Sequence, residues 1–162
     1  MQPAMRAVLD TNVWLDWLVF DDPSVATLRA AVAAGALRLV ANRHARDELA
    51  EVIARPALRN QARTARARRA SPAPLADPPD VLAEFDALVL PIETREGCGL
   101  QCSDPADQPF VDVAVACGAR WLLSKDRALL ALAARARTRF GLSIVAPARF
   151  EWTAGALARH AR

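Results

Sequence analysis

Short apolar segments alternate with segments of helical periodicity along most of this chain. Buried strands are predicted where the apolar runs occur, at 7–10, 36–41, 88–92, 120–124 and 142–147. Helices are predicted where apolar residues recur at helical spacing, at 23–35, 45–55, 80–87, 107–117 and 126–136. This alternation predicts an α/β fold with three layers, α/β/α, around a mainly parallel central sheet.

The length of 162 residues fits one domain. We expect residues 1–150 to form that domain and residues 151–162 to form a C-terminal helical tail. The proline-rich segment 71–80 is short and central, so it is interpreted as a loop and not as a domain boundary. No apolar run approaches the roughly 18 residues of a membrane-spanning helix, and the N-terminus lacks a signal-peptide pattern, so we expect a cytoplasmic protein without a membrane partner.

Two compositional features bear on ligands. The three cysteines include no C-x-x-C pair, and we expect reduced thiols that hold no metal. The segment 55–69 carries six arginines and no acid, which is typical either of a helix that follows a phosphate backbone or of a solvated helix face. The candidate RNA-binding residues are these six: Arg55, Arg59, Arg63, Arg66, Arg68 and Arg69.

Four acids stand at strand ends or in helices that follow strands. Asp10 ends the first predicted strand, Asp126 follows the strand 120–124, Asp107 opens a helix and Glu48 lies in the helix 45–55. Because the carboxyl ends of parallel strands form the site in such folds, these acids can converge there. Clustered carboxylates repel one another unless a cation offsets them, and oxygen ligands suit Mg²⁺ or Mn²⁺. Such ions can hold a phosphate and activate water for phosphodiester hydrolysis.

Each acid also has a purely structural interpretation. Asp107 and Asp126 could each cap the helix that follows, and Glu48 could pair with Arg46 or Arg55 on the protein surface. Asp10 is harder to explain structurally, because it ends an apolar run and precedes two polar residues. We expect Asp16, the next acid, to be a surface or capping residue.

Three segments of the sequence resemble those of the PIN-domain nucleases. They are VLDTNVWL, ELAEVIARP and CSDPADQPFVDVAVACGARWLLSKDRALLAL, and the similarity extends over residues 6–150. The branch that they resemble contains the toxin components of toxin–antitoxin systems. The resemblance implies an α/β/α fold, Mg²⁺- or Mn²⁺-dependent endoribonuclease activity on RNA, a homodimer, and inhibition by a small cognate antitoxin.

The family's acidic site corresponds to Asp10, Glu48, Asp107 and Asp126, which the resemblance implies are both catalytic residues and metal ligands. It also implies supporting roles for Asn12 and Ser124, and Asp104 is a further acid that could join the metal shell or only start a turn.

Lys125 is a departure from the family pattern, which has glycine beside the last acid. Its side chain could contact phosphate or point to solvent. The alternative function is a PIN-like RNA- or partner-binding module with little or no catalysis. The complete set of four acids favours the enzyme.

Overall fold

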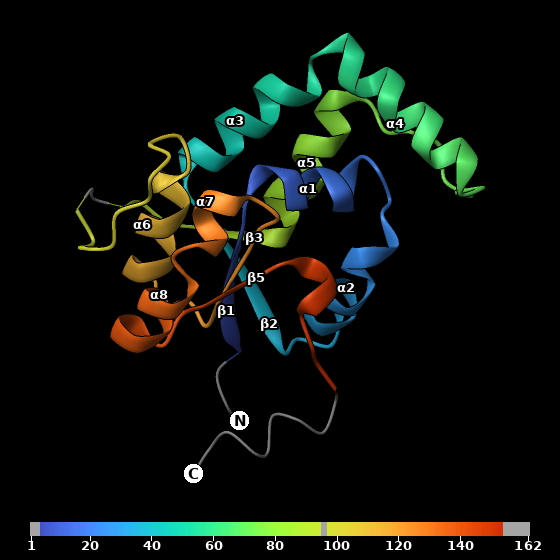
Figure 1. Cartoon of the computed structure of the whole chain (residues 1–162). Helices are drawn as coiled ribbons and strands as arrows, with labels where there is room; N and C mark the ends of the chain where they lie inside the picture. Colours follow the sequence, from blue (N-terminus) through green and yellow to red (C-terminus); the bar gives the residue numbers. More distant parts are fainter. Residues whose placement is uncertain (1–3, 95–96, 154–162) are drawn as a thin grey trace.

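A five-stranded parallel sheet forms the centre of the structure, a computed structural model that describes residues 4–94 and 97–153 (Figure 1). Its strand order is β3-β2-β1-β4-β5, and all four pairings between neighbours are parallel. The strands are β1 (Met5–Leu9), β2 (Leu37–Ala41), β3 (Val89–Pro91), β4 (Trp121–Leu123) and β5 (Ser143–Val145). They lie where the apolar runs predicted them, and the parallel sheet confirms the α/β prediction.

Helices cover both faces of the sheet, which confirms the three-layer arrangement (Figure 1). α6 packs across β1, β2 and β4 on one face, while α1 and α2 lie on the other side of the sheet. The helices are α1 (Thr11–Leu18), α2 (Ala26–Ala33), α3 (Arg43–Ile53), α4 (Pro56–Arg68), α5 (Pro78–Leu88), α6 (Gln108–Ala116), α7 (Arg127–Leu130) and α8 (Ala133–Phe140), with 3-10 turns η1 (Pro23–Val25) and η2 (Pro147–Arg149).

The buried core anchors the central strand and the helix that follows it. Val8 and Leu9 of β1 are almost fully buried, and so is Trp14 of α1, whose ring centroid lies 4.6 Å from that of Phe85 on α5. Large aromatic side chains contribute much of the burial energy of such a core. This packing fixes the position of the turn between β1 and α1, where Asp10 lies.

Local sequence signals account for two helix ends. Asp22 caps η1 by accepting the Ser24 N–H at 2.8 Å. Gly35, which follows the end of α2, has φ +71°, a left-handed conformation that glycine adopts without strain.

Other elements differ from the predictions. The segment 71–80, interpreted as a loop, contains the start of α5, because Pro78 and Pro79 occupy the first helical turn, where a missing N–H costs nothing. The single helix expected at 126–136 divides into α7 and α8, and α1 was not predicted. Of the expected C-terminal helical tail, residues 151–153 are not helical, and residues 154–162 lie outside the described residues.

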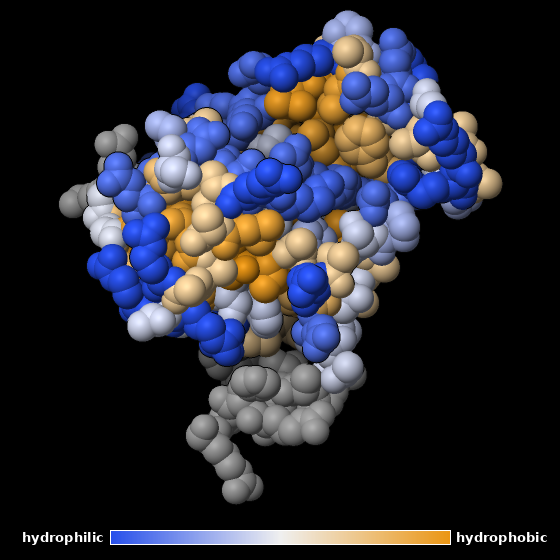
Figure 2. All heavy atoms as spheres, in the orientation of Figure 1, coloured by the Kyte–Doolittle hydropathy of each residue, from blue (hydrophilic) through white to orange (hydrophobic). Residues whose placement is uncertain are grey.

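α4 extends from the end of α3 at the periphery of the molecule (Figure 1). Ala62 is the buried residue of this helix, and Figure 2 shows a hydrophilic surface along its outer side. Within residues 4–94 and 97–153, no helix combines the length and the apolar character needed to cross a membrane.

Candidate active site

The pairing of β1 with β4 brings two sequence-predicted residues together at the carboxyl end of the sheet. Leu9 lies opposite Leu123, so Asp10 and Ser124 are the first residues beyond each strand. The Asp10 N–H donates to the Leu123 carbonyl at 3.1 Å, and the Ser124 hydroxyl donates to Oδ2 of Asp10. Ser124 Oγ in turn accepts the N–H of Asp126 at 2.9 Å. The Ser124 hydroxyl thus joins the carboxylate of Asp10 to the backbone of Asp126.

Asp10 is a buried carboxylate with few neutralising neighbours. It is 3% exposed, and its Oδ1 caps α1 by accepting the Val13 N–H at 2.9 Å. Burial raises the pKa of Asp10 to about 6, although the hydrogen bonds from Ser124 and Val13 and the charge of Lys125 oppose this effect. The nearby charge of Asp126 raises the pKa further. The fold therefore keeps a carboxylate in a position where its negative charge is costly.

Asp107 and Asp126 form the second part of the site. Asp107 occupies the N-cap position of α6 but makes no capping hydrogen bond, and its Oδ2 is buried without a partner. The pKa of Asp107 rises to about 7, first because of burial and then because of Asp126, with contributions from the charges of Asp104 and Asp10. Asp126 does cap α7, since its Oδ1 accepts the Ala128 N–H at 2.7 Å. A capping role therefore accounts for Asp126 in part and does not account for Asp107.

Glu48 approaches the site from α3. Its Oε2 accepts the Thr11 hydroxyl at 2.8 Å and lies 3.7 Å from Nε2 of His44. The surface pairs considered for Glu48 do not form, because Arg46 binds Asp86 and Arg55 binds Glu51. Thr11 directly follows Asp10, so its hydroxyl links Glu48 to the β1–α1 turn.

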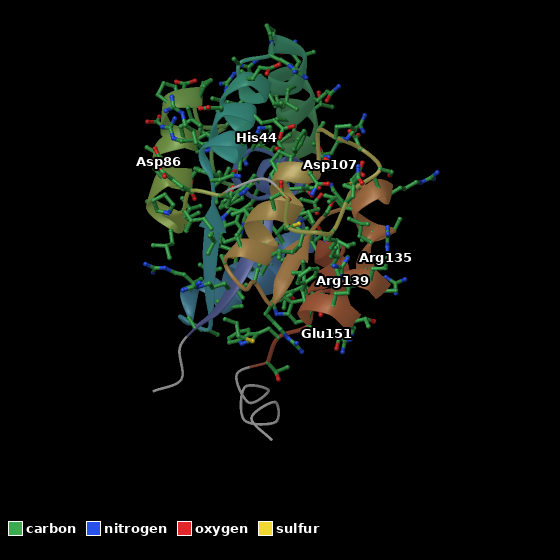
Figure 3. All side chains as sticks on the ribbon, turned by 90° about the vertical axis from the view of Figure 1, so that its left-hand side faces the viewer. His44, Asp86, Asp107, Arg135, Arg139 and Glu151 are labelled. Carbon is green, nitrogen blue, oxygen red and sulfur yellow. The ribbon has the colours of Figure 1, made fainter. Side chains whose placement is uncertain are left out.

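Sequence reasoning missed Thr11 and His44. The signal for His44 was its position four residues before Glu48, on the same face of a helix. Figure 3 shows His44 and Asp107 at the same end of the sheet, with Glu151 toward the opposite end.

Lys125 and Asp16 form an ion pair beside the site. Nζ of Lys125 lies 2.6 Å from Oδ2 of Asp16, which is 6% exposed. The prediction of a surface or capping role for Asp16 is wrong, because this side chain is buried in α1 and its carboxylate pairs with Lys125. Burial raises the pKa of Asp16, and the hydrogen bond and charge of Lys125 lower it. Lys125 is thus engaged by Asp16, while its side chain remains 48% exposed.

The other supporting residues are more peripheral. Asn12 is exposed in the first turn of α1. Asp104 is exposed in the loop before α6, where its Oδ1 accepts the Ala106 N–H at 2.9 Å, a turn-forming contact. Its charge still reaches Asp107, as the raised pKa of Asp107 indicates.

Several of the six candidate RNA-binding arginines are engaged within the protein. Arg59 binds the Ala76 carbonyl and Asp77, and Arg66 and Arg69 bind the carbonyls of Val19 and Phe20. Arg55 pairs with Glu51, as described above. Arg63 donates a hydrogen bond to Asn60 of its own helix at 3.2 Å, and no hydrogen bond or ion pair joins the Arg68 side chain to another described residue. The outward surface of α4 therefore presents Arg63 and Arg68.

The donor atoms of the acid cluster suit a hard divalent cation. No group of three or more His, Cys, Asp or Glu side chains within the described ranges has a geometry ready to hold a metal ion. Asp107 nevertheless offers a buried, unpartnered carboxylate oxygen, and Asp126 and Asp10 raise its pKa through their charges. A cation would relieve that repulsion, and oxygen-only donors favour Mg²⁺ or Mn²⁺. The residues present fit such an ion.

The protein is an α/β/α protein with a parallel sheet, and aspartates lie just beyond two of its central strands. The model of the PIN domain family matches residues 6–128, and the chain belongs to this family. The fold is also similar to a chain in the crystal structure of VapBC2 from Rickettsia felis bound to a DNA fragment from their promoter. The two share 13% identity with a TM-score of 0.53, over 86% of this chain and 97% of that chain. No curated protein matches this sequence.

Proposed function

We propose that this protein is a Mg²⁺- or Mn²⁺-dependent endoribonuclease that hydrolyses RNA phosphodiester bonds. The proposal is carried by the hydrogen bonds of Ser124, which join Asp10 to the backbone of Asp126 beyond β1 and β4. Asp107 lies near enough for the charges of both acids to raise its pKa, and its Oδ2 is buried without a partner. Membership of the PIN domain family supports it. Perturbed carboxylates at the end of a parallel sheet are typical of a site that does chemistry.

Asp10, Asp107 and Asp126 would hold the ion, with Glu48 completing the shell directly or through water. A bound ion supplies positive charge for the phosphate and lowers the pKa of water toward neutrality. The chain itself orients these carboxylates. Ser124 fixes Asp10 by donating a hydrogen bond to it, and the Thr11 hydroxyl fixes Glu48.

We further propose that the protein is the toxin of a toxin–antitoxin pair in the cytoplasm. The similarity of its fold to a chain of VapBC2 supports a small cognate antitoxin as partner. A homodimer is part of the same proposal. The arginines of α4, with Arg63 and Arg68 outermost, would attract the RNA backbone.

A binding module with little or no catalysis is the second candidate. The absence of a ready three-ligand metal geometry in the described part of the chain favours it. The exposed arginines of α4 would serve such a module equally well.

A cleavage assay separates the two functions. Purified protein is incubated with labelled single-stranded RNA in Mg²⁺, in Mn²⁺ or in EDTA, beside Asp10→Asn and the exposed control Glu84→Gln. The nuclease predicts metal-dependent cleavage by the wild type and Glu84→Gln, and none by Asp10→Asn. Cleavage that survives Asp10→Asn contradicts the assigned site. Binding without cleavage across varied RNAs establishes the module.

A further inference from the structure

A cavity opens beside the acid cluster. It has a volume of about 1020 Å³ and is bounded by the start of α3, the end of β3 and the loop that leads into α6. His44 lines it and also lies 3.7 Å from Glu48. Cys102 and Gln108 line it from the other side, and Gln108 directly follows Asp107 in the chain. The cavity therefore shares a boundary with the proposed catalytic site.

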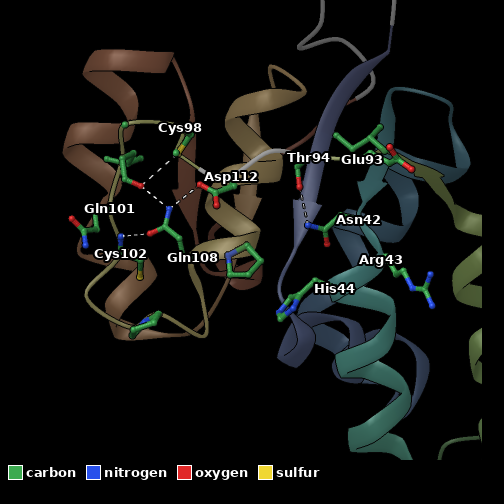
Figure 4. A pocket seen from close by; sticks show the side chains of 16 residues that line it. Asn42, Arg43, His44, Glu93, Thr94, Cys98, Gln101, Cys102, Gln108 and Asp112 are labelled. Atoms are coloured by element: carbon green, nitrogen blue, oxygen red, sulfur yellow. Dashed lines mark hydrogen bonds between the residues drawn. The ribbon is translucent and has the colours of Figure 1, made fainter.

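Its two walls are separately braced. Figure 4 shows hydrogen bonds that join residues of the same wall. On the loop side, Gln108 accepts the Cys102 N–H at 2.7 Å and donates to the Leu100 carbonyl and to Asp112, each at 2.9 Å. On the strand side, Asn42 donates to Thr94 at 3.3 Å. These hydrogen bonds order each wall from within and leave the space between the walls open to a ligand.

The lining disfavours an anion inside the cavity and suits a neutral planar group. Asp112 is a buried carboxylate and Glu93 is a second acid of the lining, so a phosphate would meet negative charge there. The His44 side chain is 44% exposed and its ring is held edge-on by Phe110, with centroids 5.9 Å apart. The cation of Arg43, with a side chain 91% exposed, stands at the outer edge.

We propose that this cavity binds one unpaired nucleobase of the RNA strand whose phosphate lies at the acid cluster, and that His44 stacks on that base. The proposal rests on the nuclease function proposed above. The base enters between the two walls, where Asp112 accepts hydrogen bonds from base amino groups. The backbone stays outside, where Arg43 can meet phosphate. His44 is thus a substrate-binding residue that contributes to the choice of cleavage position.

A binding experiment tests the cavity without any catalysis. The four nucleoside 5′-monophosphates and ribose 5-phosphate, which lacks a base, are titrated in EDTA into ¹⁵N-labelled protein. The proposal expects shifts of the Asn42, His44 and Gln108 amide signals that require the base, and about tenfold weaker binding to His44→Ala than to the matched control Thr138→Ala, as loss of one stacking contact predicts. Equal shifts with ribose 5-phosphate, or equal affinity of the His44→Ala variant, overturn it.

A cleavage experiment tests the position of the base. Once the cleaved bond of an RNA is mapped, a base-free nucleotide replaces each flanking nucleotide in turn. At one position, loss of the base should reduce kcat/KM about tenfold in the wild type and in His44→Phe, which keeps a flat ring. The same change should have no such effect in His44→Ala. The subsite is refuted if the base-free nucleotide reduces kcat/KM equally at every position. It is also refuted if the reduction in His44→Ala equals that in the wild type. Absence of cleavage would refute the proposed function instead, and leaves the titration to decide on the cavity.

Discussion

The buried charge of Asp10 should make the metal-free protein less stable than its inactive variant. Asp10→Asn removes the negative charge but keeps a side-chain oxygen that can accept the Val13 N–H. The pKa of Asp10 rises from 3.8 to about 6 on folding, chiefly through burial. A difference of about 2 pKa units corresponds to roughly 3 kcal/mol lost from the free energy of unfolding once the carboxyl is ionised in both states.

The sign follows from proton binding. Between pH 3.8 and about 6 the folded state retains a proton that the unfolded state has released. The contribution of Asp10 to stability is therefore full below pH 3.8 and falls as the pH rises through this window. Above about pH 7 the wild type bears the full free-energy cost of the ionised, buried Asp10 carboxylate. The Asp10→Asn variant has no such charge and no such cost. The variant should gain up to about 3 kcal/mol at pH 7.5, or roughly 6–12 °C in Tm for a domain of this size.

Thermal unfolding followed by circular dichroism at pH 4.5 and pH 7.5 measures this gain. In EDTA, the Tm advantage of Asp10→Asn should grow between the two pH values, whereas Asp107 titrates in both proteins and largely cancels. Excess Mg²⁺ or Mn²⁺ should raise the Tm of the wild type and close the gap, because a ligand that binds only the folded state stabilises it. Glu84→Gln should match the wild type throughout. A Tm difference that stays constant with pH would refute the reasoning.

Two further predictions concern the charged side chains of Lys125 and of α4. Lys125→Met should lower the free energy of unfolding, measured by urea denaturation, by about 2 kcal/mol, because it leaves Asp16 buried without its partner. The double variant with Asp16→Asn should recover most of this loss. A Lys125→Met variant as stable as the wild type would contradict a stabilising pair. Arg63→Ala with Arg68→Ala should weaken RNA binding and reduce the slope of log affinity against log salt by about 0.7 per arginine, while Arg135→Ala on α8 should not. A slope unchanged by the double substitution would exclude α4 as the RNA contact.

Much of the fold could be predicted because apolar periodicity is a local property. The run that ends at Leu9 and the run that ends at Leu123 each mark a strand by themselves, and parallel pairing then places the acids beyond them at one edge. Helix ends such as that at Gly35 were predictable for the same reason, since one glycine in the left-handed conformation stops a helix.

The remaining features depend on tertiary geometry that no local pattern encodes. Asp16 and Lys125 can pair only because of the direction in which α1 leaves the sheet. The engagement of Arg66 and Arg69 with loop carbonyls likewise depends on where α4 packs. From the sequence all six arginines of 55–69 are alike, and only their packing distinguishes those that hold the fold from those that face outward.

The hydrogen bond from Ser124 to Asp10 joins residues that are 114 positions apart. The carboxyl end of β1 is synthesised early, but β4, which places Ser124 and Asp126 beside it, comes after most of the domain. A nascent chain whose β4 segment has not yet emerged from the ribosome therefore has no assembled acid cluster. If the protein cleaves RNA as proposed, its own incomplete chains cannot attack the messenger that encodes them.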